Sequence, residues 1–180
     1  ARRRGEGNVA WGVRAAKEMV GGGDGDWSYV ALVGGRDLSA FRVRVAQSHM
    51  RHDLLPSYWS ECLLVELDPT DVGASSVHHV PLAQPGGPSF PTGHNGVLRV
   101  PLTDFDDARR FPNIALIALP VPQEKVLAQV ARFAASRASF DALEHVLRWL
   151  AFVWGSARTG NPLFDGVGLP SACLLESVAA

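Results

Sequence analysis

The middle of the sequence consists of short apolar segments separated by glycine, proline and aspartate, and this pattern constrains the fold more than any other feature. Segments of this length and composition are typical of β-strands. They cover residues 27–33, 41–46, 62–67, 77–82, 97–102 and 114–119. In residues 41–46, apolar side chains alternate with Arg42 and Arg44, as expected for a strand with one face in water. The close spacing of the segments predicts a β-meander.

Helical patterns lie on both sides of these strands. Residues 9–20 repeat apolar side chains at intervals of three and four, which is the period of an amphipathic helix. Pro122 opens a second helix, residues 141–154 form a third, and Pro170 opens the last. The inner face of the second helix is predicted to carry Val126, Val130 and Phe133.

A helix, a run of strands and then more helices predict an α+β protein with a central antiparallel β-meander packed by helices. The chain has 180 residues, which is about the size of one domain. We therefore expect a single domain over residues 1–180, in which the pattern defines residues 1–40 less clearly. Residues 174–180 form a helical pattern with no stop signal after it.

Composition and charge argue against several classes of function. Hydrophobic residues make up 47% of the chain, charged residues 19%, and the formal net charge is -1. A chain without excess positive charge is not expected to bind nucleic acid. The sequence has no apolar stretch long enough to span a membrane and only two cysteines, so we expect a cytoplasmic protein. It has no nucleotide-binding glycine motif and no CxxC pair, so no cofactor or metal is expected.

The start of the last helix is the main candidate for chemistry. Cys173 follows a glycine-rich loop and Pro170. The free backbone N–H groups at a helix start stabilise a thiolate and can hold an oxyanion. The alternatives are that Cys173 is a small buried apolar side chain and that Ser171 is a helix cap.

A cysteine nucleophile needs a histidine base from elsewhere in the fold. His49 lies in a predicted loop between two strands and is one candidate. His79 is another, and it follows His78 on a predicted strand, so their side chains point to opposite faces. The alternative for His49 is a solvated loop histidine, and of the adjacent pair only one can face the core. A histidine metal cluster is not expected.

Two further clusters are interpreted as structural. Asp104, Asp106 and Asp107 are expected to form a turn and cap cluster rather than a pair of catalytic carboxylates. Tyr58 and Trp59 are expected to pack beside a strand rather than line a ligand pocket.

Four stretches of the sequence carry a family pattern. They are Trp59-Ser60-Glu61-Cys62-Leu63-Leu64-Val65, the strand over residues 96–102, Ser139-Phe140-Asp141, and the helix start from Pro170 to Glu176. Together they resemble the circularly permuted branch of the NlpC-type papain-like hydrolases, which contains peptidases, amidases and acyl-transfer or lipid-directed enzymes. In that branch a histidine opens a central strand, several short strands follow, and the catalytic cysteine starts a late helix. The resemblance implies a papain-like fold in permuted order.

The two catalytic positions depart from this pattern. Glu61 stands where the family has its histidine, and Ser171 stands where it has its cysteine. Cys173 comes two residues later, which on a helix is a rotation of about 200°. The resemblance therefore implies that both members of the catalytic pair are changed.

Two hypotheses remain open. In the first, the protein is a divergent hydrolase in which Cys173 or Ser171 attacks an amide, ester or thioester of a small-molecule, peptide or lipid substrate. His49 or His79 is then the base, or His79 is the third, orienting residue. In the second, the protein is a papain-like scaffold without catalysis that serves as a binding or structural subunit and has a protein partner. Glu61 and Ser171 favour the second hypothesis.

Overall fold

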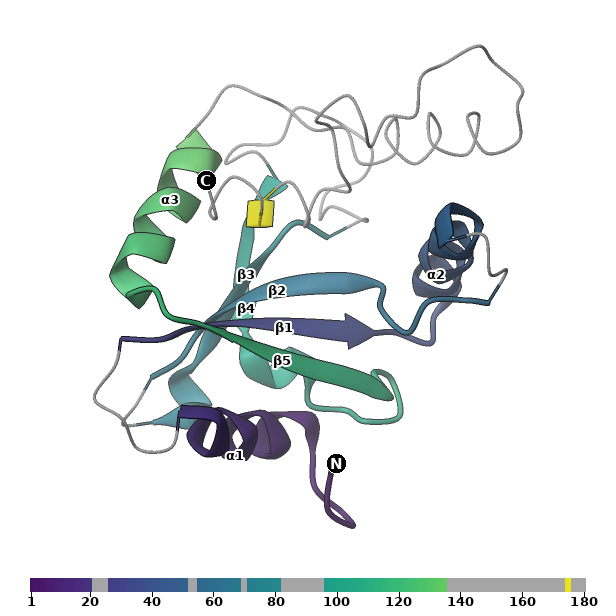
Figure 1. The fold of residues 1–180 in the computed structure, drawn as a ribbon, viewed down its shortest axis with the longest axis horizontal. Coiled ribbons are helices and arrows are strands. Elements are labelled where there is room, and N and C mark those ends of the chain that lie inside the picture. The colour runs from purple at the N-terminus through teal and green to yellow at the C-terminus, as the bar shows by residue number, and fades with distance from the viewer. Residues whose placement is uncertain (21–25, 52–54, 69–70, 82–95, 136–173, 176–180) are drawn as a thin grey trace. The chain divides into compact units, whose positions relative to one another are not determined.

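The computed structural model describes residues 1–20, 26–51, 55–68, 71–81, 96–135 and 174–175 (Figure 1). In chain order the elements are α1 (Asn8–Val20), β1 (Ser28–Gly34), α2 (Leu38–Arg51), β2 (Glu61–Glu66), the short 3-10 helix η1 (Val72–Ala74), β3 (Ser76–His79), β4 (Leu98–Pro101), the 3-10 helix η3 (Leu102–Phe105), β5 (Asn113–Leu119) and α3 (Gln123–Ala135). The predicted helix over 141–154 lies outside the described residues.

The contacts divide the chain into two compact units. The first consists of Ala1–His78 with Arg99–Leu127, and the second of His79–Leu98 with Ala128–Ala180. Almost all of the sheet, together with α1 and α2, belongs to the first unit. The single domain expected from the sequence stays a prediction.

The five strands form one sheet in the order β4-β3-β2-β1-β5, with β2 in the middle (Figure 1). The β1–β2, β1–β5 and β2–β3 pairs are antiparallel. The N–H of Leu102 donates to the carbonyl of Ser75, which brings the end of β4 to the start of β3. Strands β1 to β4 thus follow one another across the sheet, and β5 returns to the opposite edge. The predicted α+β class and meander are confirmed.

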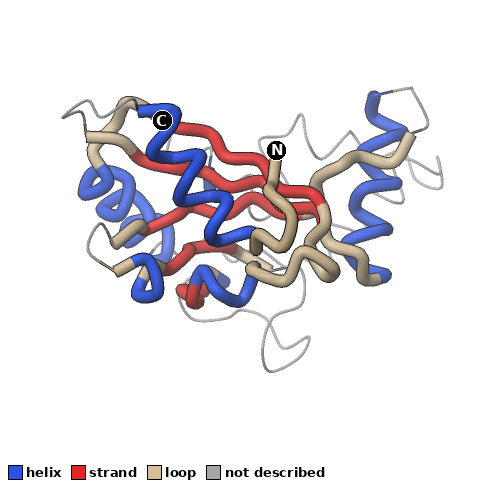
Figure 2. Tube along the Cα trace, turned by 90° about the horizontal axis from the view of Figure 1, so that it is seen from below, coloured by secondary structure: helices blue, strands red, loops and turns tan. Residues whose placement is uncertain are grey.

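One face of the sheet forms the core of the first unit. Alternate side chains of β1, β2 and β3 point to this face, and α1 crosses it (Figure 2). The buried members of this core cluster are Ala31, Val33, Leu63, Val65, Val77, Phe105 and Phe111. The predicted amphipathic period of α1 is confirmed by Ala16, which is buried, and by Val9 and Val13, which line the space against the sheet.

Helix α1 is held in place by a buried amide at its first residue. Asn8 is 1% exposed, and its Nδ2 donates to the carbonyls of Phe105 and Phe111, both at 2.9 Å. Its Oδ1 accepts from Arg2 at 2.6 Å. Asp106 accepts the N–H of Val9 at 2.8 Å and so acts as a cap from a distant segment. These bonds fix α1 to the segment between β4 and β5.

The prediction of a strand over residues 41–46 is wrong, because these residues lie inside α2. The Oδ1 of Asp37 accepts the N–H of Ala40 at 2.8 Å, which is the bond of a helix N-cap. Ala40 and Val43, three residues apart, are both buried, as on the inner face of a helix. The predicted loop is therefore wrong for residues 48–51, which belong to α2.

The helix predicted to open at Pro122 is confirmed as α3. Its three predicted inner-face residues, Val126, Val130 and Phe133, are all buried. Gln123, at its start, accepts the N–H of Leu67 at 3.1 Å and links the helix to the end of β2.

Candidate functional site

The structure describes part of the predicted catalytic set. Ser171 and Cys173 lie outside the described residues, and of His49 only the backbone is described. The expectation that His49 lies in a loop is wrong, since α2 extends to Arg51. Glu61 and His79 are described with their side chains. The pairing of a nucleophile with a histidine base therefore stays a prediction.

Glu61 is the first residue of β2, the middle strand of the sheet. It pairs with Val33 of β1. By alternation it shares a face with Leu63 and Val65, which are buried in the core beneath α1. Glu61 therefore stands at the end of the core-facing row of β2, where it is partly buried.

The next residue, Cys62, carries a thiol of low reactivity. It lies on β2 opposite Leu32 of β1, and burial raises the pKa of its thiol to about 11. Because the thiolate is the reactive form, Cys62 is protonated at neutral pH and is expected to react slowly with electrophiles.

The adjacent histidines of β3 point to opposite faces, as the sequence predicted. His79 alternates with Val77 and is 6% exposed, so it is a core histidine rather than a solvated one. His78 lies on the other face, where it belongs to a polar cluster that the sequence did not predict.

This Glu66 cluster joins three strands through one carboxylate oxygen. The Oε2 of Glu66 on β2 accepts from Ser76 Oγ and from Arg99 Nε, and it lies beside His78 Nε2. All three distances are 2.9 Å. Ser76 and His78 are on β3 and Arg99 is on β4, so the Glu66 cluster links β2, β3 and β4.

The electrostatics of the Glu66 cluster follow from these contacts. The bond from Arg99, followed by those from His78 and Ser76, lowers the pKa of Glu66 to about 2 against the opposing effect of desolvation. Glu66 in turn raises the pKa of Arg99. Glu66 is therefore ionised near neutral pH and holds a fixed negative charge between its partners.

The Glu66 cluster has the composition of a serine–histidine–carboxylate site but not its geometry. In such a site the histidine lies between the nucleophile and the carboxylate. Here the Ser76 hydroxyl donates directly to Glu66, and Ser76 is buried. The arrangement stabilises strand pairing rather than activating a hydroxyl.

Sequence reasoning missed the Glu66 cluster because its members come from three strands. Glu66 and Ser76 meet only through the β2–β3 register, in which they are direct partners. The one available signal was Glu66 itself, a carboxylate at the end of an apolar strand. In a central strand such a carboxylate needs a hydrogen-bonding or charged partner.

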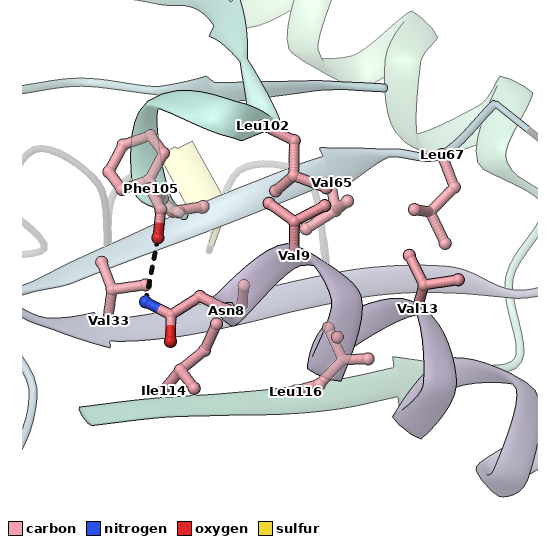
Figure 3. A pocket seen from close by; sticks show the side chains of 13 residues that line it. Asn8, Val9, Val13, Val33, Val65, Leu67, Leu102, Phe105, Ile114 and Leu116 are labelled. Carbon is pink, nitrogen blue, oxygen red and sulfur yellow. Dashed lines mark hydrogen bonds between the residues drawn. The ribbon is translucent and has the colours of Figure 1, made fainter. Parts of the chain in front are cut away.

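An apolar cavity of about 30 Å³ lies between α1 and the core face of the sheet (Figure 3). It is lined by Val9, Val13 and Gly12 of α1 and by core residues of the sheet, including Val65 and Leu116. This volume is far below the roughly 300–1,000 Å³ of a typical small-molecule pocket. It is a packing gap beside a helix glycine, not a binding site.

The aspartate cluster forms a turn and a cap, as the sequence predicted. Asp106 caps α1, and the Oδ1 of Asp107 accepts the N–H of Arg109 at 2.7 Å in a tight turn. The prediction that Tyr58 packs beside a strand is wrong, because Tyr58 is 66% exposed; its ring lies 6.3 Å from that of Trp59 at a tilted angle.

Comparisons with known proteins give no relative: no protein-family model, no curated protein and no solved structure matches the chain. Among the described residues there is no group of three histidine, cysteine or acidic side chains that could bind a metal ion. In the same part of the chain, no helix has both the length and the apolar character needed to cross a membrane.

Proposed function

We propose that this chain is a circularly permuted papain-like domain whose catalytic pair has been replaced, and that it serves as a binding or structural subunit of a larger assembly. The observation that supports this most is the position of Glu61. It opens the middle strand of an antiparallel sheet, followed by β3 and β4, in the place where the family pattern has its histidine.

The chemistry of the exchange argues against catalysis. An imidazole takes the proton of the nucleophile and becomes a cation that stabilises a thiolate. A carboxylate in its place cannot form such a cation. Ser171, in the place of the cysteine, is a weaker nucleophile that depends still more on a base. The Glu61 and Ser171 combination therefore lacks the activation that the family's pair provides.

The competing proposal is a hydrolase that uses Cys173 or Ser171 on an amide, ester or thioester, with His49 or His79 as base. One observation favours it: Leu174 and Leu175 are helical, so Cys173 precedes described helical residues. His79 as base is disfavoured because a side chain 6% exposed has little access to a substrate.

Labelling with two electrophiles separates the two proposals. A thiol-directed reagent and a serine-directed fluorophosphonate are reacted across pH with the wild type and with Cys173→Ala, Ser171→Ala and Cys62→Ala. Cys62 is a suitable internal reference, since its raised pKa makes it slow.

A non-catalytic domain gives slow thiol labelling that falls with decreasing pH and no fluorophosphonate adduct. Fast labelling of Cys173 below about pH 7, or a fluorophosphonate adduct lost in Ser171→Ala, would overturn the scaffold proposal in favour of the hydrolase.

A further inference from the structure

The two edges of the sheet differ in how they are protected against pairing with another strand. β4 is four residues long, carries the exposed Arg99 and ends at Pro101. Short length, charge and proline all discourage edge pairing. β5 is seven residues long and contains no charged residue and no proline. Among the described residues β1 is its only strand neighbour, so within this part of the chain the other edge of β5 is unpaired (Figure 1).

The open edge of β5 is bounded at both ends. Pro112 and Pro120 flank the strand, and proline has no N–H to continue a ladder. Within the strand, Ile117 is 42% exposed although it is a large aliphatic residue. The backbone groups available for a further strand are therefore confined to the seven residues of β5.

The sequence of β5 is complementary in size to itself. In an antiparallel pair with a two-fold axis at Leu116, Ile114 lies opposite Ala118 of the second copy, and Ile117 lies opposite Ala115 of the second copy. A large side chain meets a small one at each of these positions, on both faces of the sheet. Leu116 meets its own equivalent at the axis.

The flanking prolines select this register. Because side chains alternate between faces, a two-fold axis must pass through a residue position. An axis at Ile117 would place Ile114 opposite Pro120, and an axis at Ala115 would place Ala118 opposite Pro112. Both alternatives bring a proline into the ladder, whereas the axis at Leu116 leaves both prolines outside it.

We propose that β5 is an interface with a second copy of this chain, in which two β5 strands pair antiparallel about Leu116 and join two five-stranded sheets into one. The size pattern favours a second copy as the partner, because the large side chains of β5 lie opposite small side chains of the same sequence. The absence of charge in β5 also matters, since self-pairing brings like charges together. This inference does not depend on the proposed function, which concerns β2 and the last helix.

Cysteine cross-linking tests the register. Ala115→Cys and Ile117→Cys are prepared separately with the native cysteines retained, then oxidised alone and as a mixture. The mixture is expected to form a disulfide between positions 115 and 117 of different copies. Each variant alone should not form a disulfide across the interface. The two copies of position 115, or of position 117, lie diagonally across the strand pair and about 7–8 Å apart, which is too far for a disulfide. Cross-linking that is equal in all three samples would overturn the register.

Sedimentation velocity tests the interface itself. The wild type is expected to be a dimer that dissociates on dilution over about a hundredfold range of concentration. Ile117→Lys should be monomeric throughout. Val121→Lys, at a residue 38% exposed just outside the strand, is the matched control and should dimerise like the wild type. A wild type that is monomeric at every concentration, or a dimer unaffected by Ile117→Lys, would overturn the proposal.

Discussion

Replacing Asn8 by alanine should destabilise the protein strongly, because its side chain is buried and makes three hydrogen bonds. The amide of Asn8 donates to two carbonyls, those of Phe105 and Phe111, in a buried site. The alanine variant leaves both carbonyl oxygens buried without these donors, at about 1–3 kcal/mol each. It also removes the acceptor of Arg2. We expect the free energy of unfolding to fall by about 3 kcal/mol.

Urea denaturation of the wild type and Asn8→Ala measures this loss, provided that the free energy of unfolding falls with urea concentration at the same slope in both proteins. Asn113→Ala is the matched control, since Nδ2 of Asn113 also donates to a carbonyl, that of Tyr58, but in an exposed position. It should cost only about 0.5 kcal/mol. A loss below about 1 kcal/mol for Asn8→Ala would refute the argument that this amide anchors α1.

Three further predictions concern packing and charge. Gly12→Ala should raise the free energy of unfolding by about 1 kcal/mol, because Gly12 is inside α1 and a Cβ there meets no atom within 4 Å. The melting temperature should rise by about 2–4 °C. Gly5→Ala, at a φ of 80°, should lower the melting temperature. Gly34→Ala should destabilise by more than about 2 kcal/mol in urea, because its Cβ would overlap the carbonyl oxygen of Tyr58, and an unchanged midpoint would contradict that. The pKa of Glu66 in the folded protein is about 2, below the ordinary value of 4.5, so its contribution to stability is present above about pH 4.5 and is lost as the pH falls towards 2. The shift corresponds to at most about 3 kcal/mol, and because Arg99 is 60% exposed we expect about 1–2 kcal/mol. The difference in unfolding free energy between the wild type and Glu66→Gln should therefore shrink from pH 6 to pH 3, and a constant difference would count against the ion pair.

Local patterns predicted much of the fold. The three-and-four period of α1 and the inner face of α3 are unambiguous, and the structure has both helices. Residues 41–46 were misassigned because alternation with Arg42 and Arg44 fits a strand over six residues. The N-cap at Asp37, followed by Ala40 and Val43 at helical spacing, was the signal that decides for a helix.

Contacts between distant segments could not be predicted in the same way. The cap that Asp106 gives to α1 joins residues far apart in the sequence, and the Glu66 cluster depends on the register of β2 and β3. Register is set by which faces are buried, and one sequence does not define it for polar side chains. Of the candidate site, the structure describes Glu61 at the start of a central strand, and its catalytic position stays a prediction.

The most direct test of the central claim is to restore the family's pair and measure thiol reactivity. Ser171→Cys/Cys173→Ala is compared with the same protein carrying Glu61→His, using a thiol-directed reagent at pH 6. If Glu61 and Ser171 occupy the two catalytic positions, the added histidine should speed labelling at position 171 by about tenfold or more, because a neighbouring imidazolium lowers the pKa of the thiol. Equal labelling rates in the two variants, with both folded, would contradict the account.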